Sequence, residues 1–391
     1  MDKKIIRIAV IGVGNMGYAH AKHLFEGGVK DASLAALCDN DPVRLEELRK
    51  LFPDVPCYSD AEELFASGIC DAVMIATPHY AHPTIGISAF EHGLHVISEK
   101  PLAVQVSAGE AFAKAAKSSG KAFSVMFNQR TDPVFAKARE MIKSGKLGGI
   151  KRFNWIITNW YRTQSYYDSG SWRASWRGEG GGVLMNQAPH NLDLLRWILG
   201  MPARIFSVCN VGKFHQIEVE DEALLMMEYE NGATGVFHTS TGEFPGTNRL
   251  EIVGDLGKIV LEEGKLRYWK LLVNEREFCY NSKESFSKIP MEYQEMQFPR
   301  KNNAHGAILQ NFVNHILYGE ELISNGFEAL EEVALCNGAY LSSWKGSWVD
   351  FPLDPQEFDK FLFERIKGSD FNQKRAKAEN ECYQERWQVR W

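Results

Sequence analysis

The first third of the chain alternates between short apolar runs and helical patterns, and this alternation constrains the fold more than any other feature. The apolar runs are Ile5–Ile11, Ser33–Cys38, Ala72–Ala76, His95–Ser98 and Phe123–Phe127. The helical patterns between and after them are Met16–Phe25, Pro42–Leu51, Ala61–Ala66, His82–His92 and Val106–Ser119. Apolar strands that alternate with helices are typical of a parallel sheet covered on both faces. Because such crossovers are right-handed, we predict an α/β fold that begins with a doubly wound parallel sheet.

The pattern changes after about residue 150, where strand-like runs follow one another with tight turns. Glu222–Tyr229 and Thr234–Thr239 are joined through Asn231-Gly232, which predicts a β-hairpin. Arg249–Val253 and Lys258–Leu261 indicate a second hairpin. We therefore expect a second α/β domain built on a large, mostly antiparallel open sheet. The predicted divisions are 1–128 for the first domain, 129–354 for the second and 355–391 for a charged, aromatic C-terminal tail.

Composition excludes several classes of partner. The formal net charge of -6 gives no reason to expect a nucleic acid or an anionic membrane as partner. No apolar run approaches the ~18 residues of a transmembrane helix. The 7 cysteines are scattered without a CxxC pair, so neither a metal site nor a disulfide framework is expected. We predict a cytoplasmic protein with reduced thiols and no bound metal.

A glycine motif follows the first predicted strand. Gly12, Gly14 and Gly17 have GxGxxG spacing between a strand and a helix, where backbone N–H groups can approach a pyrophosphate. Asp39 ends the next strand and is placed to accept hydrogen bonds from the adenosine ribose while repelling a 2′-phosphate. We therefore favour NAD over NADP, although Arg44 lies one helical turn further on. The loop residues Asn15 and Met16 complete this predicted site.

Polar side chains follow two later strands of the predicted parallel sheet. Thr77 and His79 come after Ala72–Ala76, and Glu99 and Lys100 come after His95–Ser98. The carboxyl ends of such strands form the edge where ligands bind in open α/β sheets. A lysine beside the cofactor can be partly desolvated and take part in proton transfer from a substrate hydroxyl. His82, which opens the following helix, is a further candidate contact to the nicotinamide side.

These motifs together resemble the Gfo/Idh/MocA oxidoreductases over about residues 5 to 350. The resemblance rests on the glycine motif, Asp39, "ATP" at 76–78, "EKP" at 99–101 and the "GGG…H..D" pattern of 180–193. It implies a Rossmann domain followed by an α/β domain whose open sheet often serves subunit association. It also implies NAD(P)-dependent oxidation or reduction of a sugar or polyol. By this resemblance, Lys100 and His190 are the catalytic pair.

The second-half motif carries three polar groups within two turns. If its helix begins near Gln187, Asn186, His190 and Asp193 share a face, which the resemblance directs at the nicotinamide and Lys100. His190 would then take the hydroxyl proton, Asp193 would orient the imidazole, and the glycines 180–182 would let the backbone approach a ligand. The family commonly has Asp where this chain has Asn186. Asn186 therefore either hydrogen-bonds substrate or serves as the helix N-cap.

Other predicted contacts come from the second half and from the end of the last parallel strand. Asn128, Trp172 and Arg173 resemble family positions near the nicotinamide carboxamide, although Arg173 could instead pair with a surface carboxylate. Trp160 lies in a segment rich in aromatic residues and arginine, which suits the face of a sugar ring. His305 begins a helix and is predicted to face the site. The alternative for the aromatic segment is packing on the sheet or at an interface.

Three functions remain open from the sequence. The first is an NAD-dependent dehydrogenase of a secondary alcohol in a sugar, glycoside or polyol. The second is a redox-assisted glycoside-cleaving enzyme, in which bound NAD oxidises C3 transiently and elimination follows. The third is a non-catalytic NAD-sensing regulator, which the presence of both Lys100 and His190 disfavours. A homodimer or homotetramer formed through the C-terminal sheet is expected.

Overall fold

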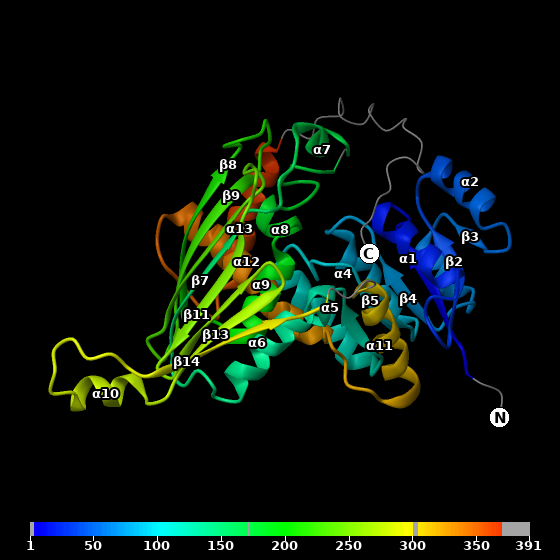
Figure 1. Ribbon diagram of the computed structural model, residues 1–391. Coiled ribbons are helices and arrows are strands. Elements are labelled where there is room, and N and C mark those ends of the chain that lie inside the picture. The colour runs from blue at the N-terminus through cyan, green and yellow to red at the C-terminus, as the bar shows by residue number, and fades with distance from the viewer. Residues whose placement is uncertain (1–3, 171, 300–303, 370–391) are drawn as a thin grey trace.

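The first sheet of the protein is the parallel sheet that the alternation predicts. The computed structural model describes residues 4–170, 172–299 and 304–369 (Figure 1). The strand order is β3-β2-β1-β4-β5-β6, and every neighbouring pair is parallel. The strands are β1 (Ile6–Ile11), β2 (Ala32–Cys38), β3 (Cys57–Tyr58), β4 (Ala72–Ile75), β5 (His95–Ser98) and β6 (Phe123–Val125). The helices are α1 (Asn15–Phe25), α2 (Pro42–Leu51), α3 (Ala61–Ala66), α4 (Ala81–Glu91) and α5 (Val106–Ser119).

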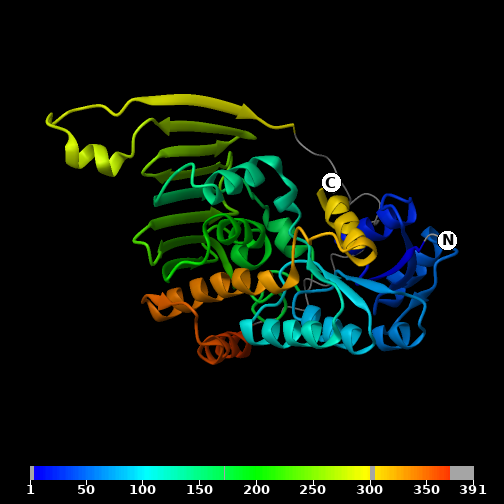
Figure 2. The ribbon, with the colours of Figure 1, turned by 90° about the horizontal axis from the view of Figure 1, so that it is seen from below.

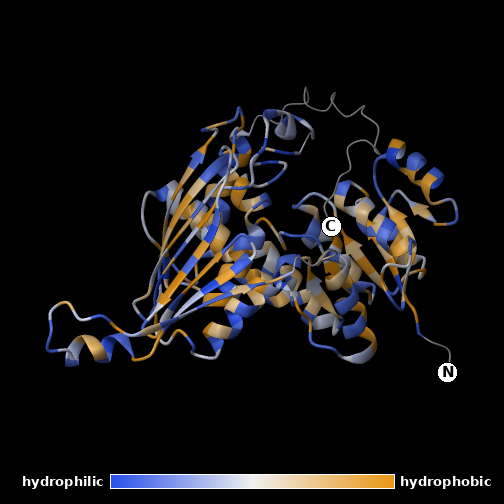
Figure 3. Ribbon diagram, in the orientation of Figure 1, coloured by the Kyte–Doolittle hydropathy of each residue, from blue (hydrophilic) through white to orange (hydrophobic). Residues whose placement is uncertain are grey.

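Burial explains why these residues form strands rather than surface segments. All four residues of β4 are buried, as are most of β1, and the strands of this sheet are strongly hydrophobic in Figure 3. A sheet covered on both faces requires such continuous apolar strands. The order reverses between β1 and β4, so the loops that follow these two strands flank the topological switch point, where open α/β sheets bind ligands. The predicted fold is confirmed.

The second sheet has nine strands in the order β14-β13-β12-β11-β7-β10-β9-β8-β15. β10 pairs with β7 in parallel, and the other neighbouring pairs are antiparallel. Both predicted hairpins are confirmed, as β9–β10 and β11–β12. The strands are β7 (Ile150–Ile157), β8 (Arg204–Val211), β9 (Glu220–Glu228), β10 (Thr234–Ser240), β11 (Asn248–Gly254), β12 (Gly257–Glu262), β13 (Lys265–Leu271), β14 (Met291–Gln297) and β15 (Val349–Asp350).

Helices cover one face of this second sheet, as Figure 2 shows. Alternate residues of β9 such as Leu225 and Met227 are buried on that face, while Leu224 and Met226 are exposed on the other. The remaining helices are α6 (Pro133–Lys143), α7 (Gln164–Asp168), α8 (Val183–Asn186), α9 (Pro189–Leu199), α10 (Glu275–Asn281), α11 (Ala304–Tyr318), α12 (Ala329–Lys345) and α13 (Pro355–Gly368). Short 3₁₀ helices are η1 (Asn128–Thr131) and η2 (Gly326–Glu328).

Two late helices, α11 and α13, pack into different hydrophobic cores. Helix α11 lies within the predicted second domain 129–354, yet its Leu309 and Phe312 are buried in the core formed by β1, α1 and α2 of the first sheet (Figure 1). In the predicted tail 355–391, α13 buries Phe358 and Leu362 in the other core, so this part of the tail is a packed helix. Residues 370–391 lie outside the described residues. In the described part of the chain, no helix has both the length and the apolarity needed to cross a membrane.

Candidate active site

The loop between β1 and α1 has the geometry of an anion site. Gly12 has a φ of +79°, and a Cβ there would lie 2.7 Å from the Thr77 backbone nitrogen, so the turn requires glycine. At Gly14, which precedes α1, a Cβ would meet only the Arg44 guanidinium, at 3.9 Å. The first turn of α1 carries no acidic residue and no side-chain cap. This helix N-terminus therefore has no side-chain cap, and its first N–H groups and positive dipole end suit a pyrophosphate.

Asp39, at the end of β2, ties the glycine loop to the neighbouring strand. Its Oδ2 accepts from the backbone N of Val13 at 2.8 Å, and its Oδ1 accepts from the backbone N of Asp41 at 3.0 Å. Arg44 lies 3.4 Å from the same carboxylate, so its positive charge is paired with Asp39. Asn15 and Met16 are the first residues of α1. The residues present fit an NAD molecule, because the carboxylate is held beside an open helix N-terminus.

The loop after β4 is fixed by histidines. His82 is fully buried, with Nε2 2.7 Å from the Thr77 carbonyl and Nδ1 2.8 Å from the Pro101 carbonyl. Both ring nitrogens therefore lie within hydrogen-bond distance of backbone carbonyls, and the contact between His82 and the nicotinamide side stays a prediction. The Thr77 hydroxyl is buried without a hydrogen-bond partner among the described residues. His79 donates through Nδ1 to the Glu179 carbonyl at 2.9 Å, which joins this loop to the second domain.

A second group of polar side chains surrounds Glu99, at the end of β5. Glu99 is buried and accepts from His20 Nε2 at 2.8 Å. Burial opposes ionisation of Glu99, but the hydrogen bond and charge of His20 more than offset it and place its pKa below the usual value. The His305 ring lies edge-on to His20 at 5.8 Å, and Asn128 Nδ2 lies 3.3 Å from His305 Nδ1. His305 and Asn128, predicted separately, are thus neighbours.

Lys100 reaches across to the second domain. Its Nζ donates to the backbone oxygen of Asn186 at 2.7 Å and lies 3.5 Å from Asn186 Oδ1. Burial lowers the pKa of Lys100, against the opposing effect of the Glu99 and Glu179 carboxylates. Asn186 Nδ2 in turn donates to Glu179 Oε1. The structure therefore brings Lys100 and Asn186 together, as the sequence predicted, and adds a carboxylate that the sequence reading did not identify.

The helix predicted to begin near Gln187 begins at Pro189, and a separate short helix precedes it. Asn186 ends α8, and α9 begins at Pro189 with Ala188 as its N-cap and no side-chain cap hydrogen bond. The alternative that Asn186 caps the helix is therefore wrong. The glycines 180–182 are also corrected: added Cβ atoms would collide with Val104, the Tyr340 hydroxyl and the Glu220 carbonyl, so these glycines make room for protein rather than ligand.

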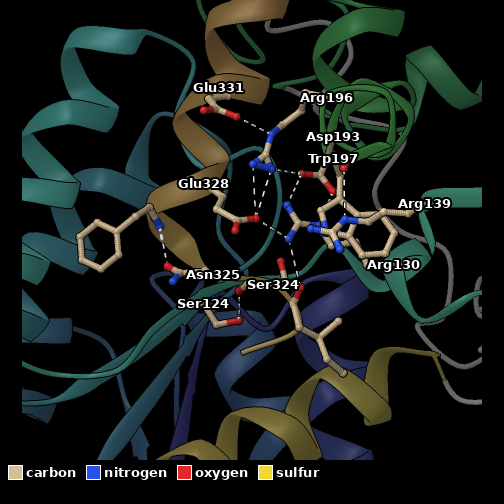
Figure 4. A network of polar contacts seen from close by, with 12 residues as sticks. Ser124, Arg130, Arg139, Asp193, Arg196, Trp197, Ser324, Asn325, Glu328 and Glu331 are labelled. Carbon is tan, nitrogen blue, oxygen red and sulfur yellow. Dashed lines mark hydrogen bonds and ion pairs between the residues drawn. The ribbon is translucent and has the colours of Figure 1, made fainter. Parts of the chain in front are cut away.

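His190 and Asp193 lie on α9 but have different partners. His190 Nδ1 is buried with no hydrogen-bond partner in the described part of the chain, and its ring lies edge-on to Phe127. Burial, and then the nearby charge of Lys100, lower the pKa of His190 to about 3. Asp193 instead receives two hydrogen bonds from Arg130, at 2.8 and 2.7 Å (Figure 4). The expected contact between Asp193 and the His190 imidazole is therefore not made.

Aromatic rings and one arginine adjoin Lys100 and Asn186. The Arg173 guanidinium lies 4.6 Å from the ring centroids of both Tyr166 and Trp172, and its Nη1 donates to the Tyr166 hydroxyl at 2.8 Å. The alternative that Arg173 pairs with a surface carboxylate is not realised. Trp172 also packs edge-on against His79. Trp160 is half-buried, with no partner for its indole nitrogen among the described residues.

The sequence reading missed four contributors: Glu179, Tyr166, His20 and Arg130. Glu179 immediately precedes the glycine run, and Tyr166 lies in the aromatic segment. No sequence spacing predicts that Glu179 contacts Asn186 or that Tyr166 contacts Arg173. His20 lies in the middle of α1 among buried residues, so a side chain that only packs in the core would be expected there. Arg130 follows the last parallel strand. Its role as the partner of Asp193 can be seen only in the structure.

Comparisons with known proteins agree with this geometry. Residues 6–127 match the description "Oxidoreductase family, NAD-binding Rossmann fold", and residues 135–260 match "GFO/IDH/MocA C-terminal domain". The chain belongs to the Gfo/Idh/MocA family. It is an NAD-binding oxidoreductase of that family, as the sequence motifs predicted.

Individual relatives in the family cover most of the chain. The scyllo-inositol 2-dehydrogenase (NAD(+)) of Bacillus subtilis is 29% identical over 83% of this chain and 90% of its own. The D-apiose dehydrogenase of Rhizobium rhizogenes is 27% identical over 90% and 99%. Among solved structures, the WlbA dehydrogenase of Bordetella pertussis in complex with NADH and UDP-GlcNAcA has a TM-score of 0.74 at 27% identity. That comparison covers 90% of this chain and 100% of the other.

Proposed function

We propose that the protein is an NAD-dependent dehydrogenase that oxidises a secondary alcohol of a sugar, glycoside or polyol, with Lys100 and His190 handling the proton. The observation that carries this proposal is the meeting of Lys100, at the end of β5, with the α8–α9 segment that bears His190. The related dehydrogenases of inositol and apiose, together with the WlbA complex, support a carbohydrate or polyol as the substrate class.

The two residues divide the proton chemistry between them. His190 is neutral at pH 7 because its pKa is lowered to about 3, so it can accept a hydroxyl proton. Lys100, held by the Asn186 carbonyl, is placed to donate a hydrogen bond to the same oxygen and stabilise its developing charge. Bound NAD supplies the acceptor for the hydride that leaves the carbinol carbon.

The remaining site residues bind and orient. Asp39 and the N–H groups at the start of α1, with Asn15 and Met16, would hold the adenosine and pyrophosphate. Thr77, His79, Asn128, Trp172 and Arg173 are the proposed contacts of the nicotinamide side, and Trp160, Asn186 and His305 are the proposed contacts of the substrate. The described cysteines are free, in agreement with a protein that works in the reducing cytoplasm.

The test is a screen of sugars, glycosides and polyols followed by NADH absorbance. A dehydrogenase forms one NADH for each molecule of substrate oxidised. Glycoside cleavage without net NADH would instead establish the redox-assisted glycosidase. No turnover with any of these classes, in protein that binds NAD, would contradict the proposal and favour a sensor.

A further inference from the structure

Glu179 is a buried carboxylate next to the proposed reaction centre. It is 2% exposed, and both its oxygens have donors. Oε2 accepts from the backbone N of Ala174 at 2.6 Å, and Oε1 accepts from the side-chain amide of Asn186. A glutamine could not accept at both of these atoms, because its amide has a single acceptor oxygen. Burial raises the pKa of Glu179, and the charge of Arg173 and the hydrogen bonds from Ala174 and Asn186 oppose this rise.

The carboxylate settles which way the Asn186 amide points. Because Nδ2 donates to Glu179, Oδ1 is the atom that lies 3.5 Å from Lys100 Nζ. The opposite orientation would place an N–H donor against an ammonium donor. The backbone oxygen of Asn186 holds the same ammonium at 2.7 Å. A chain of contacts thus runs from Ala174 through Glu179 and Asn186 to Lys100.

Other charges also act on Lys100. Carboxylates on three elements raise its pKa: Glu99, Glu179 and, from α12, Glu332. Arg173 lowers the Lys100 pKa. Lys100 in turn disfavours protonation of the imidazoles of His79, His82, His190 and His305. Of the three carboxylates, Glu179 is the one joined to Lys100 through a hydrogen-bonded side chain.

We propose that Glu179 is a positioning residue: it orients the Asn186 amide and supplies the negative charge that keeps Lys100 in a fixed geometry at the reaction centre. The role of Lys100 in this statement rests on the proposed function.

Reciprocal substitution separates this role from simple packing. Glu179→Gln has one acceptor for two donors, so either Ala174 loses its partner or the Asn186 amide turns its N–H groups toward Lys100. Asn186→Asp alone brings two carboxylates into contact, which raises the pKa of one of them. The double variant Glu179→Gln/Asn186→Asp restores a consistent chain, because the glutamine oxygen accepts from Ala174 and its NH₂ donates to the new carboxylate.

The measurement is the pKa of the Lys100 amine in the protein without substrate. Trace acetylation with acetic anhydride over a pH series, read by peptide mass spectrometry, reports the unprotonated fraction, and Lys100→Arg identifies the signal. Removing the negative charge in Glu179→Gln is expected to shift the labelling midpoint about one pH unit lower. The double variant is expected to return the midpoint to the parent value or above it. In the kinetics, kcat falls in each single variant and recovers in the double variant, while the Kd for NAD stays near that of the parent.

Glu218→Gln is the matched control, because Glu218 accepts from the backbone N of Trp176 in the same loop and does not contact Asn186. It should leave the labelling midpoint unchanged. An unchanged midpoint in a folded Glu179→Gln protein, or a double variant no better than the single ones, would overturn the inference. If the midpoint shifts as expected while no alcohol is oxidised, the positioning role stands and the proposed function fails.

Discussion

At the scale of single residues, burial and the neighbouring ammonium of Lys100 keep His190 neutral. A carboxylate bonded to the ring would instead favour its charged form. Its partner in the motif, Asp193, is committed to Arg130. An imidazole without a buried counter-ion stays a base at neutral pH. The "H..D" spacing places the two side chains on one helix, but it does not say which neighbour each will meet.

The first prediction concerns the proposed pair. His190→Ala and Lys100→Ala should each lower kcat at least ~100-fold, the usual scale for a positioned acid–base group. Tm and the Kd for NAD should change little in His190→Ala, because its ring nitrogen Nδ1 has no hydrogen-bond partner among the described residues. A His190→Ala enzyme with near-parent kcat would remove His190 from the mechanism.

The second prediction is the pH dependence of kcat/KM. His190 acts as a base, so activity is lost only when the pH falls toward its pKa of about 3, and His190 should cause no acid limb near pH 6. Lys100 acts in its charged form, so activity is lost as the pH rises through its pKa. Since burial lowers that pKa, the alkaline limb should fall below the usual lysine value of 10.5. An acid limb near pH 6.5 that disappears in His190→Gln would contradict the low pKa.

The third prediction concerns cofactor choice. Asp39 is held by two backbone N–H groups, so its charge stays where a 2′-phosphate would lie. The parent should prefer NAD, and Asp39→Ala should narrow the ratio of kcat/KM between NAD and NADP while freeing Arg44. Asp41→Ala, which removes the α2 cap, controls for local stability. Comparable kcat/KM for both cofactors in the parent would show that Asp39 does not discriminate.

At the scale of elements, the strands and helices of the first sheet follow from local sequence, whereas the break between α8 and α9 does not. The sequence predicted a helix that begins near Gln187, but it did not predict the short helix α8 before it. Proline has no backbone N–H to continue the hydrogen bonding of α8 and is well suited to the first helical turn, so the second helix begins at Pro189. This break separates Asn186 from His190 and turns its side chain to Glu179.

The second sheet shows the same limit. Its two tight hairpins carry a turn signal, and both were predictable. β7 pairs with β10 and β11, and β15 pairs with β8, in each case far away in the sequence, and no local signal predicts these partners. Helix α11 joins the first core by tertiary packing, which an amphipathic pattern cannot assign to one sheet or the other. Candidate site residues on strand ends were therefore easier to predict than those on connecting segments.

The fourth prediction tests the contact between α9 and η1. Asp193 and Arg130 are almost completely buried and paired, and Arg130 also contacts Glu328 (Figure 4). Asp193→Asn should lower the free energy of unfolding by ~3–5 kcal/mol, because it removes the buried counter-charge of Arg130 and leaves only the partly exposed Glu328 beside it. Urea unfolding measures this, and Arg130→Met/Asp193→Leu should recover part of the loss. A stable Asp193→Asn protein with a shifted kinetic pH profile would return Asp193 to the role of orienting His190.

At the scale of the whole molecule, the site depends on the joining of two sheets. Lys100 comes from the edge of the parallel sheet, and His190 comes from a helix that packs beneath the nine-stranded sheet. His79 bonds to Glu179 and Arg130 to Asp193, and both contacts span this junction. The geometry of the proton-handling pair is therefore a property of the junction, which no single segment of sequence contains.

The outer face of the nine-stranded sheet leads to the fifth prediction, that the protein associates through it. Leu224 and Met226 are each 40% exposed there, beside Ile156 at 41% and Val208 at 44%. An exposed apolar patch on a sheet is typical of a subunit interface, and a stable one buries about 800 Å² per partner. Light scattering should give a dimer or tetramer for the parent and a monomer for Leu224→Glu/Met226→Glu. Phe363→Glu, which changes an exposed apolar residue of α13, should leave the mass unchanged. A monomeric parent, or a double variant that keeps its oligomeric mass, would place the interface on another surface or show that there is none.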